Sequence, residues 1–130
     1  MAVSASLTFS KRERIVSQKL IERLFSKGSS HSTSAFPLRI VYMEKERDKV
    51  PVLMMVSVSK RHFKHAVDRN RAKRQVREAY RRHKCLLTER VAEDKSMAVA
   101  FVWLSDAPCN SRQVEKSVKR LLAKVAEQVL

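Results

Sequence analysis

A run of basic residues dominates the middle of the chain. Between positions 60 and 84 the sequence reads KRHFKHAVDRNRAKRQVREAYRRHK, with eleven Lys or Arg residues and two acidic residues. This segment therefore carries +9 of the net charge of +15. Arginine predominates, and its planar guanidinium can bind a phosphate through two parallel hydrogen bonds. The chemistry that this residue set can perform is the binding of a polyanion, with nucleic acid as the first candidate.

A helix over residues 66–87 would sort these side chains onto two faces, because successive residues are rotated by about 100°. The apolar arc of this helix holds Ala72, Val76, Ala79, Tyr80, His83, Leu86 and Leu87. The opposite arc, called the cationic stripe below, holds Asn70, Lys73, Arg74, Arg77, Arg81 and Lys84. We expect the apolar arc to pack on a sheet and the stripe to face solvent. Most exposed helix faces mix both signs of charge, so a nearly pure cationic stripe favours a nucleic-acid partner over a merely solvated surface.

Apolar patterns elsewhere predict three strands. Residues 35–43 alternate between apolar and polar side chains, whereas residues 50–58 and 97–104 are apolar almost throughout. The short charged turn at 44–49 predicts that the first two strands form an antiparallel hairpin. The third strand has the continuous apolar character of a strand that is covered on both faces.

Two more helices complete the predicted fold. A short amphipathic helix is expected at 17–27, with Gly28 at its C-terminal cap, followed by a polar loop at 29–34. A longer helix is expected at 112–129, where Ser111 can act as the N-cap. The order α-β-β-α-β-α, with a strand-helix-strand unit in the middle, predicts an α+β fold, a two-layer α/β sandwich.

Length and composition limit the class of protein. The chain fits one domain, 1–130, with residues 1–10 as a tail. It has neither the ~18 consecutive apolar residues of a membrane-spanning helix nor a secretory signal, so we expect a cytoplasmic protein with no membrane partner. Its single glycine excludes glycine-rich phosphate loops, and no small-molecule substrate is expected. Cys85 and Cys109 are expected to be reduced thiols.

No set of side chains in the sequence suggests a catalytic centre. The acidic residues are scattered, and most accompany basic residues on helix faces. His62 and His65 are three residues apart, but a zinc site needs further ligands, so we expect no metal site and interpret both as contacts to RNA phosphate or water. His83 falls on the apolar arc and is expected to be half-buried with a partner. The polypeptide is therefore expected to hold no catalytic residues.

Residues 66–78, AVDRNRAKRQVRE, resemble the AV-x-RNR-x-KR-x-x-RE signature of the bacterial ribonuclease P protein subunit. The resemblance includes SVSK at 57–60 and covers residues 11–125. It implies the fold of the second domain of ribosomal protein S5, with a left-handed βαβ crossover. It also implies that the chain is an enzyme subunit, monomeric when free. Its implied partners are the catalytic ribonuclease P RNA subunit, which removes the 5′ leader with RNA-bound Mg²⁺, and precursor tRNA.

Together with the charge pattern, the resemblance assigns candidate site residues. RNA binding is assigned to Lys60, Arg69, Asn70, Arg71, Lys73, Arg74, Arg77 and Arg81. A cleft for the 5′ leader is assigned to Ile21, Phe25, Phe36 and Arg39, with Ile21 where the family usually has Phe and Arg39 where Tyr is common. The loop at 61–65 is one residue longer than the usual form and lacks its glycine. An RNA-binding ribosomal or ribosome-assembly protein without a nuclease role is the alternative function, and a DNA-binding helix is a third.

Overall fold

The computed structural model describes residues 11–26, 28 and 30–128, so the tail predicted at 1–10 lies outside the described residues. Its elements in chain order are η2 (Lys11–Glu13, a 3₁₀ helix), α1 (Gln18–Phe25), β1 (His31–Ala35), β2 (Leu38–Glu46), β3 (Val52–Ser57), α2 (Ala66–His83), α3 (Cys85–Thr88), β4 (Lys95–Trp103) and α4 (Ser111–Gln128). The predicted α+β class is confirmed, with one strand more than the sequence predicts.

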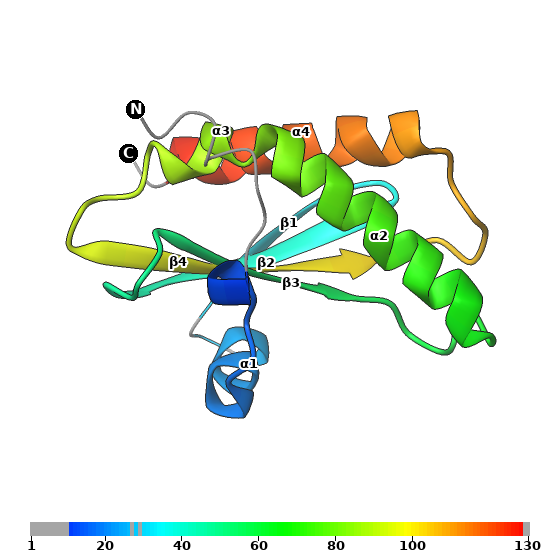
Figure 1. Ribbon diagram of the computed structural model, residues 1–130, viewed down its shortest axis with the longest axis horizontal. Coiled ribbons are helices and arrows are strands. Elements are labelled where there is room, and N and C mark those ends of the chain that lie inside the picture. The colour runs from blue at the N-terminus through cyan, green and yellow to red at the C-terminus, as the bar shows by residue number, and fades with distance from the viewer. Residues whose placement is uncertain (1–10, 27, 29, 129–130) are drawn as a thin grey trace.

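The four strands form one sheet in the order β1-β2-β4-β3 (Figure 1). Strand β4 lies between β2, to which it is antiparallel, and β3, to which it is parallel. The hairpin predicted for β2 and β3 is therefore wrong, because β4 occupies the place between them. As the sequence predicts, β4 is buried on both faces, with Met97, Val99 and Phe101 on one side and Ala98 and Ala100 on the other.

The polar loop predicted at 29–34 is wrong over the residues that form β1. This strand pairs antiparallel with β2, from His31 opposite Tyr42 to Ala35 opposite Leu38. It lies at the edge of the sheet and is mostly exposed, so its sequence HSTSA needs no apolar alternation. The chain turns between the two strands at Phe36 and Pro37, whose peptide bond is cis.

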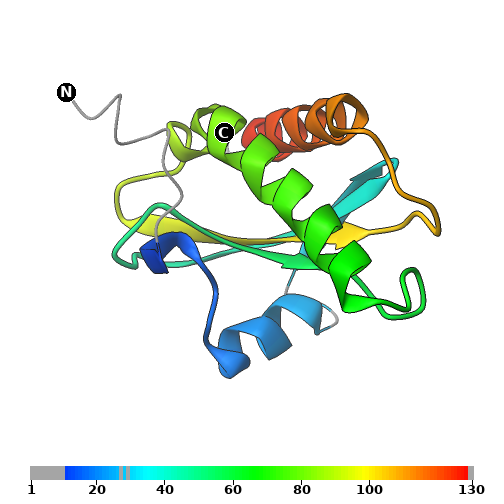
Figure 2. The ribbon, with the colours of Figure 1, turned by 45° about the vertical axis from the view of Figure 1, so that its right-hand side comes forward.

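A crossover carries α2 onto one face of the sheet. The chain leaves β3, runs back along α2 and re-enters the sheet at β4, parallel and adjacent to β3 (Figures 1 and 2). This βαβ crossover is left-handed, as the resemblance implies, against the usual right-handed rule. Helix α4 lies beside α2 on the same face (Figure 2).

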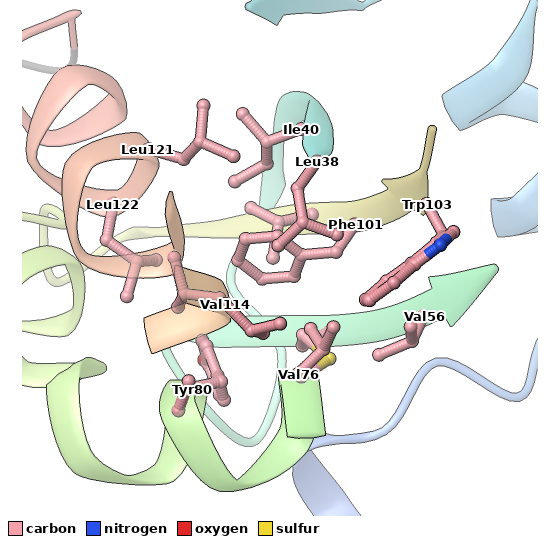
Figure 3. Packing of buried hydrophobic residues seen from close by; sticks show 14 of the residues in the cluster. Leu38, Ile40, Val56, Val76, Tyr80, Phe101, Trp103, Val114, Leu121 and Leu122 are labelled. Atoms are coloured by element: carbon pink, nitrogen blue, oxygen red, sulfur yellow. The ribbon is translucent and has the colours of Figure 1, made fainter. Parts of the chain in front are cut away.

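Two apolar clusters hold the layers together. The larger one lies between the sheet and helices α2 and α4, and its fully buried side chains include Tyr80, Phe101 and Trp103 (Figure 3). The smaller one lies on the opposite face, where Leu20 and Leu24 of α1 pack with residues of β2, β3 and β4. The long helices and the sheet thus make the two main layers, and α1 covers part of the remaining sheet face (Figure 1).

Local hydrogen bonds set the ends of the helices. Ser17 begins α1, because its side-chain oxygen accepts from the backbone N–H of Leu20 at 3.3 Å. Ser26 in extended conformation ends α1, so Gly28 is not the cap; it lies two residues further on, with a φ of 86°. At α4 the side chain of Asn110 accepts from the backbone N–H of Gln113 at 2.8 Å, so Asn110 takes the capping role predicted for the next residue.

The neighbours Leu24 and Phe25 test how α1 is attached. Leu24 is 0% exposed, whereas the side chain of Phe25 is 46% exposed. Leu24→Ala is expected to lower the free energy of unfolding by about 2–5 kcal/mol, because it leaves a cavity under α1. Phe25→Ala is expected to change it by no more than about 0.5 kcal/mol. Urea unfolding followed by circular dichroism measures both, and equal costs at the two positions would contradict this packing.

Candidate nucleic-acid interface

The rotation of α2 about its axis is set by its buried side. Ala72, Val76, Ala79 and Tyr80 are buried, as the apolar arc predicts, and the ring of Tyr80 meets Phe101 of β4 at a centroid distance of 6.2 Å. Burial raises the pKa of the Tyr80 hydroxyl far above its ordinary value. The small alanines let α2 lie close to its neighbours, and this contact directs the opposite side of the helix to solvent.

The centre of the cationic stripe faces solvent. Asn70, Arg74 and Arg77 are exposed, and Lys73 is half-buried. Within the described part of the chain, no carboxylate forms an ion pair with Arg74 or Arg77, and the uncharged amide of Asn70 lies one turn before Arg74. The pKa of Arg77 is lowered, first by partial burial and then by the positive charge of Arg14. The uncompensated charge at this place makes it the strongest candidate for an anion-binding surface.

The far end of the stripe differs from the prediction. The guanidinium of Arg81 bonds to the carboxylate of Glu78, which also lies 3.5 Å from Nε of Arg82. The hydrogen bond from Arg81 is the main cause that lowers the pKa of Glu78. Arg81 is therefore held by a carboxylate of its own helix and is less available to a ligand than the residues at the centre of the stripe.

Lys84 was predicted in the stripe, and this prediction is wrong. The residue is only 5% exposed, and its ammonium bonds to the carboxylate of Glu13, which is 8% exposed. Glu13 belongs to η2, 71 positions earlier in the chain. A helical wheel contains no information on which distant segment covers the helix, so this inward orientation could not be predicted from the spacing of the residues.

Arg69 connects the start of α2 to the preceding loop through hydrogen bonds. Its Nη1 donates to the backbone oxygens of Phe63 and Lys64 at 2.9 and 3.0 Å. Phe63 is buried against Trp103, with ring centroids 6.0 Å apart. The loop at 61–65 is thus fixed without the glycine that the family usually has there, and Arg69 is half-buried. Part of its hydrogen-bonding capacity is used within the protein.

Basic side chains surround the same end of α2. Lys60, Arg61 and Lys64 are exposed on the loop before the helix, and Arg71 is exposed in its second turn. The positive end of the helix dipole adds to their charge. The assigned residues Lys60 and Arg71 therefore lie near the stripe, and Arg61 and Lys64 join them although the signature did not single them out.

Two of the histidines contact carboxylates of the protein. Nδ1 of His62 lies 2.7 Å from Oδ1 of Asp106, so this ring is oriented by a carboxylate. Nε2 of His83 lies 2.8 Å from Oε2 of Glu115 in α4, and His83 is half-buried as predicted. The hydrogen bond from His83 is the main cause that lowers the pKa of Glu115. His65 is exposed and precedes α2.

A hollow of about 240 Å³ lies between the end of α1 and the sheet. Its lining residues are Leu24, Phe25, Ser26, Gly28, Ser30, His31, Ser32, Arg39 and Val41. The structure thus brings Phe25 and Arg39 together, with Nη2 of Arg39 donating to Oγ of Ser32 at 3.2 Å. Ile21 instead packs against the apolar cluster under α1, and Phe36 is 64% exposed at the turn after β1. The hollow combines an aromatic ring, a guanidinium and hydroxyl groups, which suit contact with a nucleotide.

The contribution of β1 to this hollow was missed from the sequence. His31 and Ser32 lie on the strand that was predicted as a loop, and their polar character gave no sign of a paired strand.

The described helices include none with the length and apolar character needed to cross a bilayer.

Comparison with known proteins gives one consistent family. The model of the family "Ribonuclease P" matches residues 9–126. A ribonuclease P protein component from Porphyromonas gingivalis is 37% identical over 131 residues, covering 99% of this chain and 94% of the relative. One from Chlorobaculum tepidum is 39% identical over 77 residues, covering 57% and 49%.

Two solved structures have the same fold. The ribonuclease P protein from Thermotoga maritima superimposes with a TM-score of 0.67 at 18% identity, covering 87% of this chain and 97% of that one. The ribonuclease P protein from Staphylococcus aureus gives a TM-score of 0.63 at 23% identity, covering 92% and 93%. The fold described above is therefore shared with proteins whose sequences are distant from this one.

The buried pair of Glu13 and Lys84 gives a test of how η2 is held on α2. Glu13→Gln is expected to lower the free energy of unfolding by about 3–5 kcal/mol, because it removes the charge that compensates a buried ammonium. The matched double variant Glu13→Leu with Lys84→Met removes both charges and is expected to lose much less. Urea unfolding measures both proteins. A Glu13→Gln variant as stable as the parent would show that the pair is not buried as described.

Proposed function

The chain belongs to the ribonuclease P protein family and is thus a component of a tRNA-processing ribonuclease, and from this membership we propose how it works. It binds the ribonuclease P RNA through the exposed part of the cationic stripe on α2, and it contacts the 5′ leader of precursor tRNA at the hollow beside α1. It is monomeric when free and acts in the bacterial cytoplasm, where precursor tRNAs are made.

One observation carries this proposal: Arg74 and Arg77 face solvent together with the amide of Asn70, and no carboxylate of the described residues forms an ion pair with either arginine. Two RNAs that approach each other are repelled by their phosphates, and cations held between them reduce this repulsion. Arginine can bind phosphate oxygens in pairs, and the amide of Asn70 can both donate and accept toward a base edge or a 2′-hydroxyl. The stripe therefore supplies charge neutralisation and orientation.

The chemical step belongs to the RNA in this proposal. We propose that cleavage uses Mg²⁺ bound by the RNA; among the residues that the structure describes, no three side chains of metal-ligand type lie together. We assign the Mg²⁺ to the RNA subunit and assign no catalytic residue to this chain. The polypeptide contributes binding energy, which orients the leader relative to the RNA that cuts it.

The hollow beside α1 is the proposed leader contact. Phe25 offers an aromatic face on which a base can stack, and Arg39 offers a cation that can contact phosphate or stack on a base. The hollow lies at the sheet face that carries α1, whereas α2 lies over the opposite face (Figure 1). Leader and RNA subunit can therefore be held at the same time on different sides of the sheet.

The salt dependence of binding tests the stripe. The variant Arg74→Ala with Arg77→Ala removes two phosphate contacts, so the slope of log affinity against log salt for the Porphyromonas gingivalis ribonuclease P RNA is expected to become less steep by about one to two. The control is Lys49→Ala with Lys95→Ala, two exposed lysines. Lys95 begins β4 and Lys49 lies between β2 and β3, whereas the loop before α2 packs on Trp103 at the other end of β4. It should leave the slope as it is in the parent. An equal slope in all three proteins would remove the stripe from the binding surface.

Reconstitution tests the function as a whole. The protein is mixed with the same RNA and a precursor tRNA at low Mg²⁺, and 5′ cleavage is expected to be faster than with RNA alone. In this assay Phe25→Ala should reduce the gain for a precursor with a long leader and leave it unchanged for one with a single leader nucleotide. Leu104→Ala, at an exposed apolar residue that does not line the hollow, is the matched control. Binding to structured RNA without any acceleration would favour a ribosomal or ribosome-assembly role instead.

A further inference from the structure

Helix α4 carries a second set of cations that the proposed function does not use. Arg112, Lys116, Arg120 and Lys124 follow one another at intervals of four residues and are called the α4 row. Residues four apart lie on the same side of a helix, one turn above the other, so the row spans about 18 Å at 1.5 Å per residue. Lys119 lies beside the row on the same exposed side.

The α4 row forms no ion pair within the described residues, although Glu127 lies three positions after Lys124 and lines the same pocket as Lys124. Arg112, Lys116 and Arg120 are exposed and Lys124 is half-buried, and no ion pair to any of the four is found among the described residues. Glu115, which could have served them, instead bonds to His83 and lies 3.8 Å from Arg82. Like charges at intervals of four destabilise a helix. The four cations make three successive repulsive pairs, and a bound polyanion would neutralise this repulsion.

The α4 row and the cationic stripe are separate surfaces. The side of α2 that faces α4 carries Arg82 and His83, which meet Glu115. The stripe lies on another side of α2, where Arg77 approaches Arg14, a residue that bridges to the β3 edge of the sheet. Carboxylates of Glu78 and Glu115 therefore lie between the two cationic surfaces. The region between the two surfaces is thus internally compensated, whereas each surface keeps its own positive charge.

We propose that the α4 row binds the phosphate backbone of a second segment of the ribonuclease P RNA, distinct from the segment held by the stripe. The identity of this RNA rests on the proposed function. The row is regularly spaced and of one sign, and it is inclined by only about 26° to the helix axis, so it offers phosphates a repeating series of positive charges. None of the large exposed apolar side chains in the described residues belongs to α4, so the row lacks the apolar anchors of a protein or membrane contact.

The test compares three variants of the full chain. The α4 variant is Arg112→Gln, Lys116→Gln, Arg120→Gln. Its matched control is Arg47→Gln, Lys49→Gln, Lys95→Gln, which removes three exposed cations between β2 and β3 and at the start of β4. The third protein is the stripe variant Arg74→Ala with Arg77→Ala. Affinity for the Porphyromonas gingivalis ribonuclease P RNA is measured at several salt concentrations. Gln keeps helix propensity and relieves repulsion, so thermal unfolding midpoints should not fall.

The α4 variant is expected to flatten the salt slope by roughly two to three, and the control by much less. Adding the stripe variant should flatten the slope further, by the amount that it contributes alone, because the two surfaces are separate. If the α4 variant keeps the parental slope, or if the control flattens it equally, the second contact does not exist. A stripe variant with a parental slope would contradict the proposed function instead, so the two failures are distinguishable.

Discussion

The burial of one side of α2 is the constraint on which the remaining arrangement depends. Val76 and Tyr80 are fully buried between the sheet and α4, and the small side chains of Ala72 and Ala79 allow a close approach. Because this contact fixes the rotation of the helix, every other position of α2 has a determined direction. Repulsion among its many positive charges would destabilise α2 as an isolated helix. The packing of its apolar side against the sheet and α4 stabilises it in the folded protein.

Strand β4 makes that packing possible. Its Val99 and Phe101 support the helices on one face, while Ala98 and Ala100 support α1 on the other. This strand is covered on both faces and paired on both edges, so its backbone is protected from solvent along its length. The helix that carries the stripe and the helix that borders the hollow therefore pack on opposite faces of the same strand.

The sequence predicts the elements whose formation depends on the local pattern of apolar residues. It does not predict strand pairing or side-chain orientation where these depend on segments far apart in the chain. Apolar periodicity located α2 and α4 and the double-sided burial of β4. The same method missed β1, because an exposed edge strand needs no apolar residues, and it paired β2 with β3, because adjacency in sequence does not reveal an inserted strand. At the site, the spacing gave the exposure of Arg74 and Arg77 but not the inward turn of Lys84, which depends on Glu13, 71 positions away.

Carboxylates divide the basic surface of this protein into parts with different properties. Glu78 holds Arg81 and lies near Arg82, Glu115 holds His83, and Glu13 holds Lys84, so one end of α2 is internally neutralised. The other end, from the loop at 61–65 to Arg77, keeps its charge. A uniformly basic helix would attract any polyanion at any register. A charge that is strong at one end and compensated at the other favours one position of an RNA segment along α2, which is the property that a protein orienting RNA requires.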